Sequence, residues 1–235
     1  MNQSNTDITD ISNRILYEDN HLLIVNKRAG EIVQGDKTGD EPLLEMVRHY
    51  IKVSANKPGN VFCGLVHRID RPVSGAVVFA KTSKALARMN ALVKERAMQK
   101  TYWAIVERIP EQPEGTLVHY MRKNERTNTS EVSSVEKAGW QRAELSYRLL
   151  AAGDKYALLE VDLHTGRHHQ IRAQLSAMGC PIKGDLKYGA RRSNEDGSIS
   201  LHARRLCFEH PVQHTEILVE APPFNQLFMK LLQSE

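Results

Sequence analysis

The feature that most constrains this chain is a short charged turn set between two apolar runs. The turn reads Val66-His67-Arg68-Ile69-Asp70-Arg71-Pro72-Val73-Ser74-Gly75, and apolar runs at 61–66 and 76–80 enter and leave it. The runs predict buried strands, and the proline and glycine favour a turn between them. We therefore expect the carboxylate of Asp70 to be held on a rigid connection between two strands.

Two arginines of the turn affect the ionisation of the Asp70 carboxyl group. Arg68 and Arg71 stand on either side of Asp70. Positive charge nearby favours the ionised form of a carboxyl group, and an ionised carboxylate on a tight loop can act as a nucleophile. The alternative is a surface Arg–Asp pair on a hairpin, and the turn by itself does not decide between the two.

The remaining sequence mixes short apolar segments with amphipathic ones. Alternating or continuous apolar residues predict strands at 22–25, 101–106, 144–150, 156–163, 201–208 and 217–219. Helical spacing predicts helices at 42–50, from Thr82 or Ser83 onward, from Gly166 to Gly179, and after Pro223. The polar stretch 122–134 predicts a loop or an exposed hairpin. This mixture indicates an α+β fold, with a mostly antiparallel mixed sheet and flanking helices.

Length and composition narrow the class of protein. The chain has 235 residues and a formal net charge of +4, which permits a polyanionic partner without requiring one. Three widely spaced cysteines argue against a disulfide framework and a zinc site. The start of the chain has no apolar segment of a signal peptide, and no run reaches the roughly 20 residues that span a bilayer. We expect a disordered tail at 1–12, one folded domain at 13–235, and a soluble cytoplasmic protein.

Several motifs in a fixed order carry a resemblance to a known family. HRIDRPVSG with VVFAKT resembles the catalytic motif of the RluA family of pseudouridine synthases, which usually reads HRLD followed by SG. ILYEDNHLLIVNKRAG, KTYWAIV, TGRHHQIR, GDLKYG and LHARRL with HP resemble its other motifs, so the likeness spans about residues 14–230. The departures are Arg28, Ile69 and Val73, where the family often has Pro, Leu and Thr, and none of them removes a reactive group.

The resemblance implies a stand-alone catalytic domain at 13–235 that converts uridine in RNA to pseudouridine without a cofactor or a metal. The matching catalytic residues are Asp70 as the nucleophile, Arg167 as its ion-pair partner, and Tyr102 packed on the target base. Whether the carboxylate attacks the sugar, attacks the base or assists a glycal route stays open.

The resemblance also implies how RNA is held. Arg68 would fill the space left by a flipped-out uridine, although a plain phosphate contact is the alternative. The other expected substrate-binding residues are His67, Arg71, Gln170 and Leu201. The implied partner is ribosomal or transfer RNA, with no DNA and no membrane, and we expect a monomer.

Two other functions compete with this interpretation. A catalytically inactive RNA-binding protein or RNA chaperone of the same fold would not need Asp70, Tyr102 and Arg167 together. A nucleoside hydrolase would be expected to have further carboxylates, and Asp70 is the only acidic residue between positions 60 and 80. His168 and His169 invite a metal-site reading, but neighbours on a helix would point about 100° apart, and no matching acid or cysteine spacing accompanies them.

Overall fold

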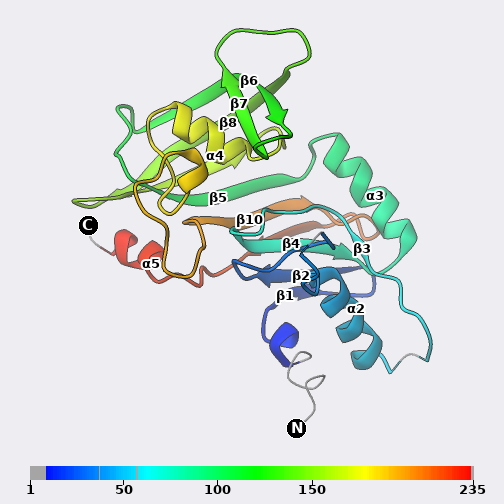
Figure 1. Cartoon of the computed structure of the whole chain (residues 1–235). Coiled ribbons are helices and arrows are strands. Elements are labelled where there is room, and N and C mark those ends of the chain that lie inside the picture. The colour runs from blue at the N-terminus through cyan, green and yellow to red at the C-terminus, as the bar shows by residue number, and fades with distance from the viewer. Residues whose placement is uncertain (1–8, 37, 57, 234–235) are drawn as a thin grey trace. The chain divides into compact units, whose positions relative to one another are not determined.

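The computed structural model describes residues 9–36, 38–56 and 58–233 (Figure 1). The chain forms two compact units. The first comprises residues 1–98 and 205–222, and the second comprises residues 99–204 and 223–235. Both combine antiparallel strands with helices, which confirms the α+β fold class.

The first unit has an antiparallel sheet, and the Asp70 turn connects two of its strands, β3 and β4. Strand β2 pairs with β1 on one side and with β4 on the other, and β3 also pairs with β4, all antiparallel. Part of β10 belongs to this unit and pairs with β11. The bounds are β1 (Ile15–Glu18), β2 (Leu22–Lys27), β3 (Gly64–Leu65), β4 (Ser74–Ala80), β10 (Leu201–Glu209) and β11 (Glu216–Glu220), with helices α2 (Leu43–Ser54) and α3 (Ser83–Lys94).

The central strands of this unit are mostly apolar and almost entirely buried. Every residue of β2 is buried, and so are the last six residues of β4. Helix α3 packs Ala85 and Met89 into the same core. The hydroxyl oxygen of Thr82 accepts a hydrogen bond from the backbone N–H of Ala85 at 3.1 Å, so Thr82 caps this helix, at one of the two residues from which the helix was predicted to begin.

The second unit has an antiparallel sheet in the order β5-β9-β8-β6-β7. The predicted strands 144–150 and 156–163 correspond to β8 and β9, which pair as a hairpin, and the polar stretch 122–134 lies in a second hairpin, β6–β7. The bounds are β5 (Gln99–Val106), β6 (Glu114–Asn124), β7 (Thr129–Ser133), β8 (Gln141–Ala152) and β9 (Ala157–Leu163), with helices α4 (Gln170–Ala177), α5 (Leu227–Leu232) and the 3₁₀ turn η1 (Leu186–Tyr188).

Two helices cover this second sheet. Helix α4 lies against the β6–β8 strands (Figure 1), where Ala173 packs with Met121 and Ala143. Helix α5 packs on β5, and the rings of Phe228 and Trp103 stack with their centroids 6.4 Å apart. Ala173 and Phe228 thus anchor α4 and α5, respectively, to the sheet.

Three expectations need correction. The predicted strand at 61–66 is reduced to Gly64 and Leu65, because only these residues pair with β4, and Phe62 is 43% exposed. The expected tail lies outside the described residues up to position 8, but residues 9–12 are helical, with Ile11 buried. The helix expected from Gly166 begins only at Gln170.

The described part of the chain contains no helix whose length and hydropathy would let it cross a bilayer.

Candidate active site

The turn that carries Asp70 is closed by its own backbone. The backbone N–H of Val73 donates to the carbonyl of Asp70 at 3.0 Å, and Val66 N–H donates to the carbonyl of Val78 at 3.2 Å. Ile69 and Val73 are buried beneath the turn, while Asp70 is half-buried. The apolar residues of the turn therefore anchor it to the core, and the carboxylate stands at the edge of solvent.

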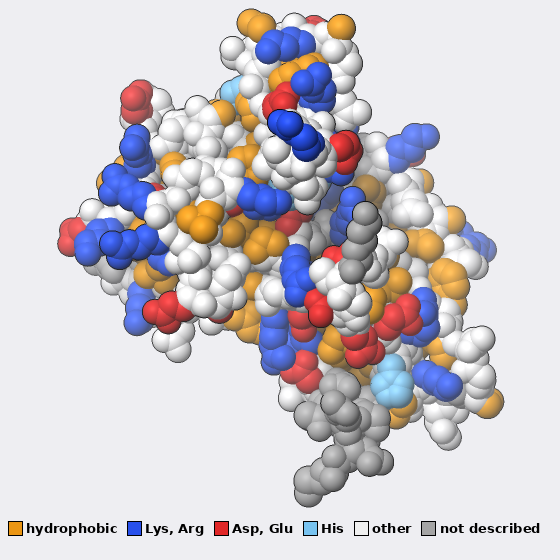
Figure 2. Space-filling view, in the orientation of Figure 1, with side chains coloured by type: hydrophobic (Ala, Val, Ile, Leu, Met, Phe, Trp, Pro, Cys, Tyr) orange, Lys and Arg blue, Asp and Glu red, His pale blue; other side chains and the backbone are white. Residues whose placement is uncertain are grey.

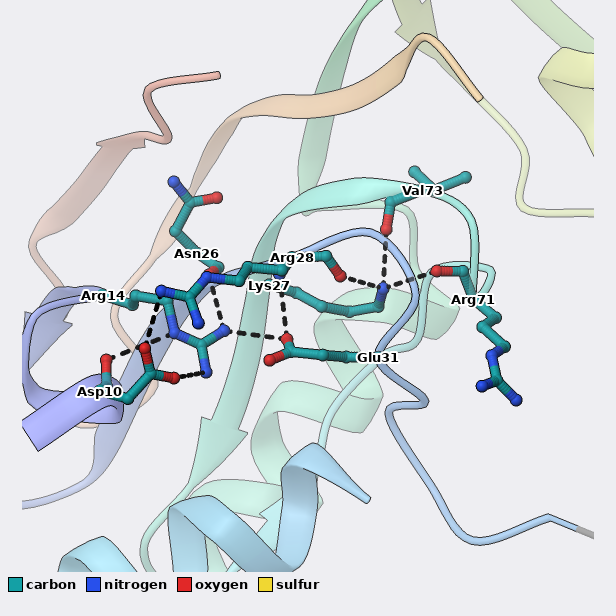
Figure 3. Close-up of polar contacts among 8 residues, drawn as sticks. All are labelled: Asp10, Arg14, Asn26, Lys27, Arg28, Glu31, Arg71 and Val73. Carbon is teal, nitrogen blue, oxygen red and sulfur yellow. Dashed lines mark hydrogen bonds and ion pairs between the residues drawn. The ribbon is translucent and has the colours of Figure 1, made fainter. Parts of the chain in front are cut away.

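A buried lysine ties this turn to β2 (Figure 3). The ammonium of Lys27 donates to the carbonyl oxygens of Arg28 at 2.8 Å, Arg71 at 3.1 Å and Val73 at 2.7 Å. The backbone N–H of Gly30 donates to the same Arg71 carbonyl at 2.8 Å. Gly30 has a φ of +91°, a left-handed conformation that favours glycine.

Burial and neighbouring charges shift the pKa of the Lys27 ammonium. Lys27 is fully buried, and burial lowers the pKa of its ammonium to about 7. The negative charges of Glu31 and Asp70 act in the opposite direction and raise it, while the positive charges of Arg14 and Arg71 lower it further. Asp70 and Lys27 are thus electrostatically linked.

An ion-pair network extends from the same end of β2 (Figure 3). The buried guanidinium of Arg14 pairs with Asp10 at 2.7 Å and with Glu31 at 2.9 Å, and Arg28 pairs with Asp10 at 2.7 Å. Glu31 also accepts the backbone N–H of Arg28 at 3.0 Å. These contacts fix the backbone on both sides of Lys27.

The other predicted residues of the turn have different surroundings. Arg68 is exposed. Arg71 pairs with Asp40 at 2.6 Å, with both side chains about half exposed, so this pair adds little to stability. The Nε2 atom of His67 accepts the backbone N–H of Val78 at 3.3 Å, which joins the turn to β4.

In the second unit, Arg167 lies on a braced loop that precedes α4. The side-chain oxygen of Gln170 accepts the backbone N–H of Arg167 at 3.0 Å and the hydroxyl of Thr165 at 2.7 Å. The Gln170 amide nitrogen donates to the carbonyl of Glu144 at 3.0 Å. Gln170, which the sequence indicated for substrate binding, is buried and stabilises the loop, while the Nε of Arg167 donates to the carbonyl of Arg142 at 3.0 Å.

The two adjacent histidines do not diverge as they would on a helix. His169 has a left-handed backbone, with φ at +52°, and its ring stacks on that of His168 with centroids 3.8 Å apart. Its Nδ1 lies 2.9 Å from the hydroxyl of Tyr188, and that hydroxyl accepts the backbone N–H of Ser130 at 2.7 Å. No group of three or more histidine, cysteine or acidic residues suited to a metal ion occurs among the described residues.

Tyr102 and Leu201 lie on strands of the second unit. Tyr102 is 7% exposed on β5, with its Cα opposite that of Val161 on β9, and Leu201 is the buried first residue of β10. The predicted residues are thus divided between the two units. The first contains His67, Arg68, Asp70 and Arg71, and the second contains Tyr102, Arg167, Gln170 and Leu201, of which Arg167 and Gln170 are in direct contact. The use of both groups in one reaction is a proposal, argued below.

Sequence reasoning missed the structural roles of Lys27 and Tyr188. The signal for Lys27 was present, because a lysine ends the strand LLIVNK, which begins with four apolar residues. Tyr188 belongs to the GDLKYG motif, but nothing in the motif indicated that its hydroxyl would bind Ser130 and His169.

Charged side chains on the β6–β7 hairpin are of both signs. Figure 2 shows basic and acidic side chains interspersed over this part of the surface. Arg122 pairs with Glu131 at 2.8 Å, and Lys123 pairs with Glu125 at 2.6 Å. The hairpin is therefore not a uniformly basic surface.

Comparisons with known proteins identify the family of this chain. Residues 21–177 match the family model described as RNA pseudouridylate synthase. An uncharacterized RNA pseudouridine synthase of Synechocystis sp. is 36% identical over 223 residues, covering 93% of this chain and 67% of that protein. The ribosomal large subunit pseudouridine synthase C of Vibrio cholerae is 32% identical over 227 residues, covering 92% of this chain and 67% of that protein.

A solved structure supports the fold. The human RNA pseudouridylate synthase domain containing 4 superposes with a TM-score of 0.80 at 23% identity, covering 98% of this chain and 96% of that one. The chain belongs to the RNA pseudouridylate synthase family and is an RNA pseudouridine synthase, an isomerase that acts on RNA.

Proposed function

We propose that the enzyme isomerises specific uridines in structured RNA, with Asp70 as the catalytic nucleophile. The reaction breaks the bond between N1 of the base and C1′ of the ribose, and it forms a bond between C5 and C1′. C5 loses a proton and N1 gains one, so the atoms balance without an oxidant, a reductant or a cofactor.

The observation that carries the proposal is the position of Asp70 on a turn whose backbone is held by several hydrogen bonds. It is a half-buried carboxylate on a turn fixed by Lys27, Gly30 and the Val73 N–H. Such a turn fixes the backbone from which the carboxylate projects, and covalent catalysis depends on a well-placed nucleophile. Its position in HRIDRPVSG agrees with the motif of the family.

Arg167 and Tyr102 are proposed to complete the site. The side-chain oxygen of Gln170 accepts the backbone N–H of Arg167, which fixes the backbone from which the Arg167 side chain extends. The guanidinium is proposed to form a two-point contact with the Asp70 carboxylate. Tyr102 is proposed to pack on the uracil ring and to take the proton from C5, since a phenol offers both a stacking face and a polar tip.

Arg68 is proposed to stabilise RNA from which the target base has been flipped. The side chain is exposed and lies two residues from Asp70, and its guanidinium is planar enough to stack where a base was. The substrate site is proposed to include four further residues, His67, Arg71, Gln170 and Leu201. Of these, His67 and Gln170 contribute chiefly by stabilising the backbone of the site.

The proposed substrate is ribosomal or transfer RNA. The name of the Vibrio cholerae relative refers to the ribosomal large subunit, which favours ribosomal RNA for this chain. We propose that the enzyme acts in the cytoplasm as a monomer.

The test is incubation of the protein with unmodified transcripts of large-subunit ribosomal RNA and of transfer RNAs. Pseudouridine has the mass of uridine but carries a different glycosidic bond, so nucleoside chromatography separates the two. Conversion at defined positions is expected. Release of free uracil would indicate a hydrolase, and binding without conversion would indicate an inactive RNA-binding protein.

A further inference from the structure

We infer that an ionic latch between the N-terminal segment and the residues after β2 positions the turn that carries Asp70. The latch is a chain of four charged side chains, Asp10, Arg14, Arg28 and Glu31 (Figure 3). All four lie in the first unit, as the turn does. The inference rests on the proposed function in one respect, since Asp70 must be the reacting carboxylate.

Asp10 is the centre of the latch, because it joins two arginines that stand on either side of β2 in the sequence. Its Oδ2 lies 2.7 Å from the Nη2 of Arg14, and its Oδ1 lies 2.7 Å from the Nη2 of Arg28. Residues 9–12 are helical, and Ile11 is buried, so the segment that carries Asp10 is anchored in the core. Asp10 therefore ties Arg28 to a fixed part of the unit.

Arg14 makes the latch stronger than a surface ion pair. Its side chain is 3% exposed, and a buried guanidinium needs counter-charges to offset the hydration it has lost. It receives two, since its Nη1 also lies 2.9 Å from Oε2 of Glu31. Shielding from water strengthens both pairs, so the two carboxylates are held in place.

The latch holds Arg28 by its backbone as well as by its side chain. Oε2 of Glu31 accepts the backbone N–H of Arg28 at 3.0 Å. These two residues flank Gly30, whose backbone N–H donates to the carbonyl of Arg71 at 2.8 Å. Because Arg71 directly follows Asp70, a shift of residues 28–31 would move the backbone from which the carboxylate projects.

The first experiment compares Asp10→Asn with Glu18→Gln in the full chain. The two carboxylates are matched, since both are 27% exposed and both contact two side chains. The partners of Glu18 are Lys81 at 2.7 Å and the hydroxyl of Tyr50 at 3.0 Å. Single-turnover rate and RNA dissociation constant are measured at a temperature at which thermal unfolding shows both variants to be folded.

For Asp10→Asn we expect a loss of about tenfold in single-turnover rate, because small misplacements of a reacting group can cost about a hundredfold. RNA affinity should change by less than about threefold, since the latch positions Asp70 and does not bind RNA. Glu18→Gln should keep the wild-type rate. A rate for Asp10→Asn within about twofold of wild type, or an equal loss in Glu18→Gln, would overturn the inference.

Arg28→Gln tests the same link while it leaves the buried pairs of Arg14 in place. The side chain of Arg28 is 50% exposed, so we expect a loss of about threefold in rate. The double variant Asp10→Asn/Arg28→Gln should be no slower than Asp10→Asn alone, because both changes break one contact. Losses that multiply, or an RNA affinity that falls more than about threefold in Arg28→Gln, would show that Arg28 acts on RNA and would overturn the inference.

Hydrogen exchange of the RNA-free protein gives a result that a general loss of stability would not produce. The Gly30 amide donates to the Arg71 carbonyl, and the Leu86 amide donates to the Thr82 carbonyl in the first turn of α3. In Asp10→Asn the protection factor of Gly30 should fall by about tenfold more than that of Leu86. Equal changes in the two amides, or no change at Gly30, would overturn the inference.

The two proposals fail in different ways. A wild-type enzyme that forms no pseudouridine contradicts the proposed function, whereas the exchange of the Gly30 amide is measured without catalysis. A wild-type enzyme that forms pseudouridine, with Asp10→Asn equally active, contradicts only the role of the latch.

Discussion

Arg172 and Asp185 form a buried two-point ion pair, with Nε 2.6 Å from one carboxylate oxygen and Nη2 2.9 Å from the other. The guanidinium also lies 5.1 Å from the ring centroid of Tyr188. Since Arg172 is in α4 and Asp185 precedes η1, the pair joins the helix that follows the Arg167 loop to the segment that carries Tyr188.

Replacing Asp185 by Asn should lower the free energy of unfolding by about 3–5 kcal/mol, because it leaves a buried guanidinium without its counter-charge. Denaturant unfolding measures this. Glu160→Gln is the control, since its pair with Arg148 is largely solvated on the arginine side and should contribute less than about 1 kcal/mol. Similar losses in the two variants would contradict the assigned role.

Replacing Tyr188 by Phe should lower the turnover rate more than it affects RNA affinity. The Tyr188 hydroxyl accepts a hydrogen bond from the Ser130 N–H and contacts His169. His169 directly precedes Gln170, whose side chain accepts the backbone N–H of Arg167. Loss of the hydroxyl should also cost about 1–3 kcal/mol of stability, since the buried Ser130 N–H loses its acceptor. Tyr120→Phe, whose hydroxyl contacts an exposed glutamate, is the control. A normal rate in Tyr188→Phe would show that Arg167 does not depend on this contact.

Replacing Arg167 by Lys should be nearly as damaging as replacing it by Ala. Lysine retains the charge but lacks the planar fork that contacts a carboxylate at two points, and it lacks the Nε that donates to the Arg142 carbonyl. The comparison is made by single-turnover kinetics. A lysine variant close to the normal rate would mean that charge alone is sufficient.

Arg68→Ala should slow the reaction more on a folded stem-loop than on an unstructured strand with the same local sequence. The proposed role of Arg68 is to stabilise RNA after the base has left its stack, and flipping costs least where the base is already unstacked. The measurement is the single-turnover rate of wild type and of Arg68→Ala on each of the two substrates. An equal loss on both would indicate a phosphate contact or a direct effect on Asp70.

Local patterns predicted much of the fold. The continuous apolar run of β2 and the Thr82 cap of α3 were readable because each depends on neighbouring residues. The run 61–66 was misleading, because apolar composition does not say whether a strand has a partner, and only Gly64 and Leu65 pair with β4.

The support of the candidate site was far less predictable. Motif order identified Asp70 and Arg167, but Lys27 reaches the Asp70 turn from a strand more than forty positions earlier in the sequence. The stacked pair of His168 and His169 depends on a left-handed residue that Tyr188 contacts from another segment. Contacts of this kind are set by tertiary packing, and no local spacing encodes them.

The central claim is that the Asp70 carboxylate performs the reaction, and the most direct measurement compares wild type with Asp70→Asn on the same transcript. Asparagine keeps the shape of the side chain and removes its charge. We expect RNA binding and thermal unfolding close to those of wild type, with pseudouridine formation below about a hundredth of the wild-type single-turnover rate. Pseudouridine formation by Asp70→Asn above that level, at the positions modified by wild type, would contradict the account.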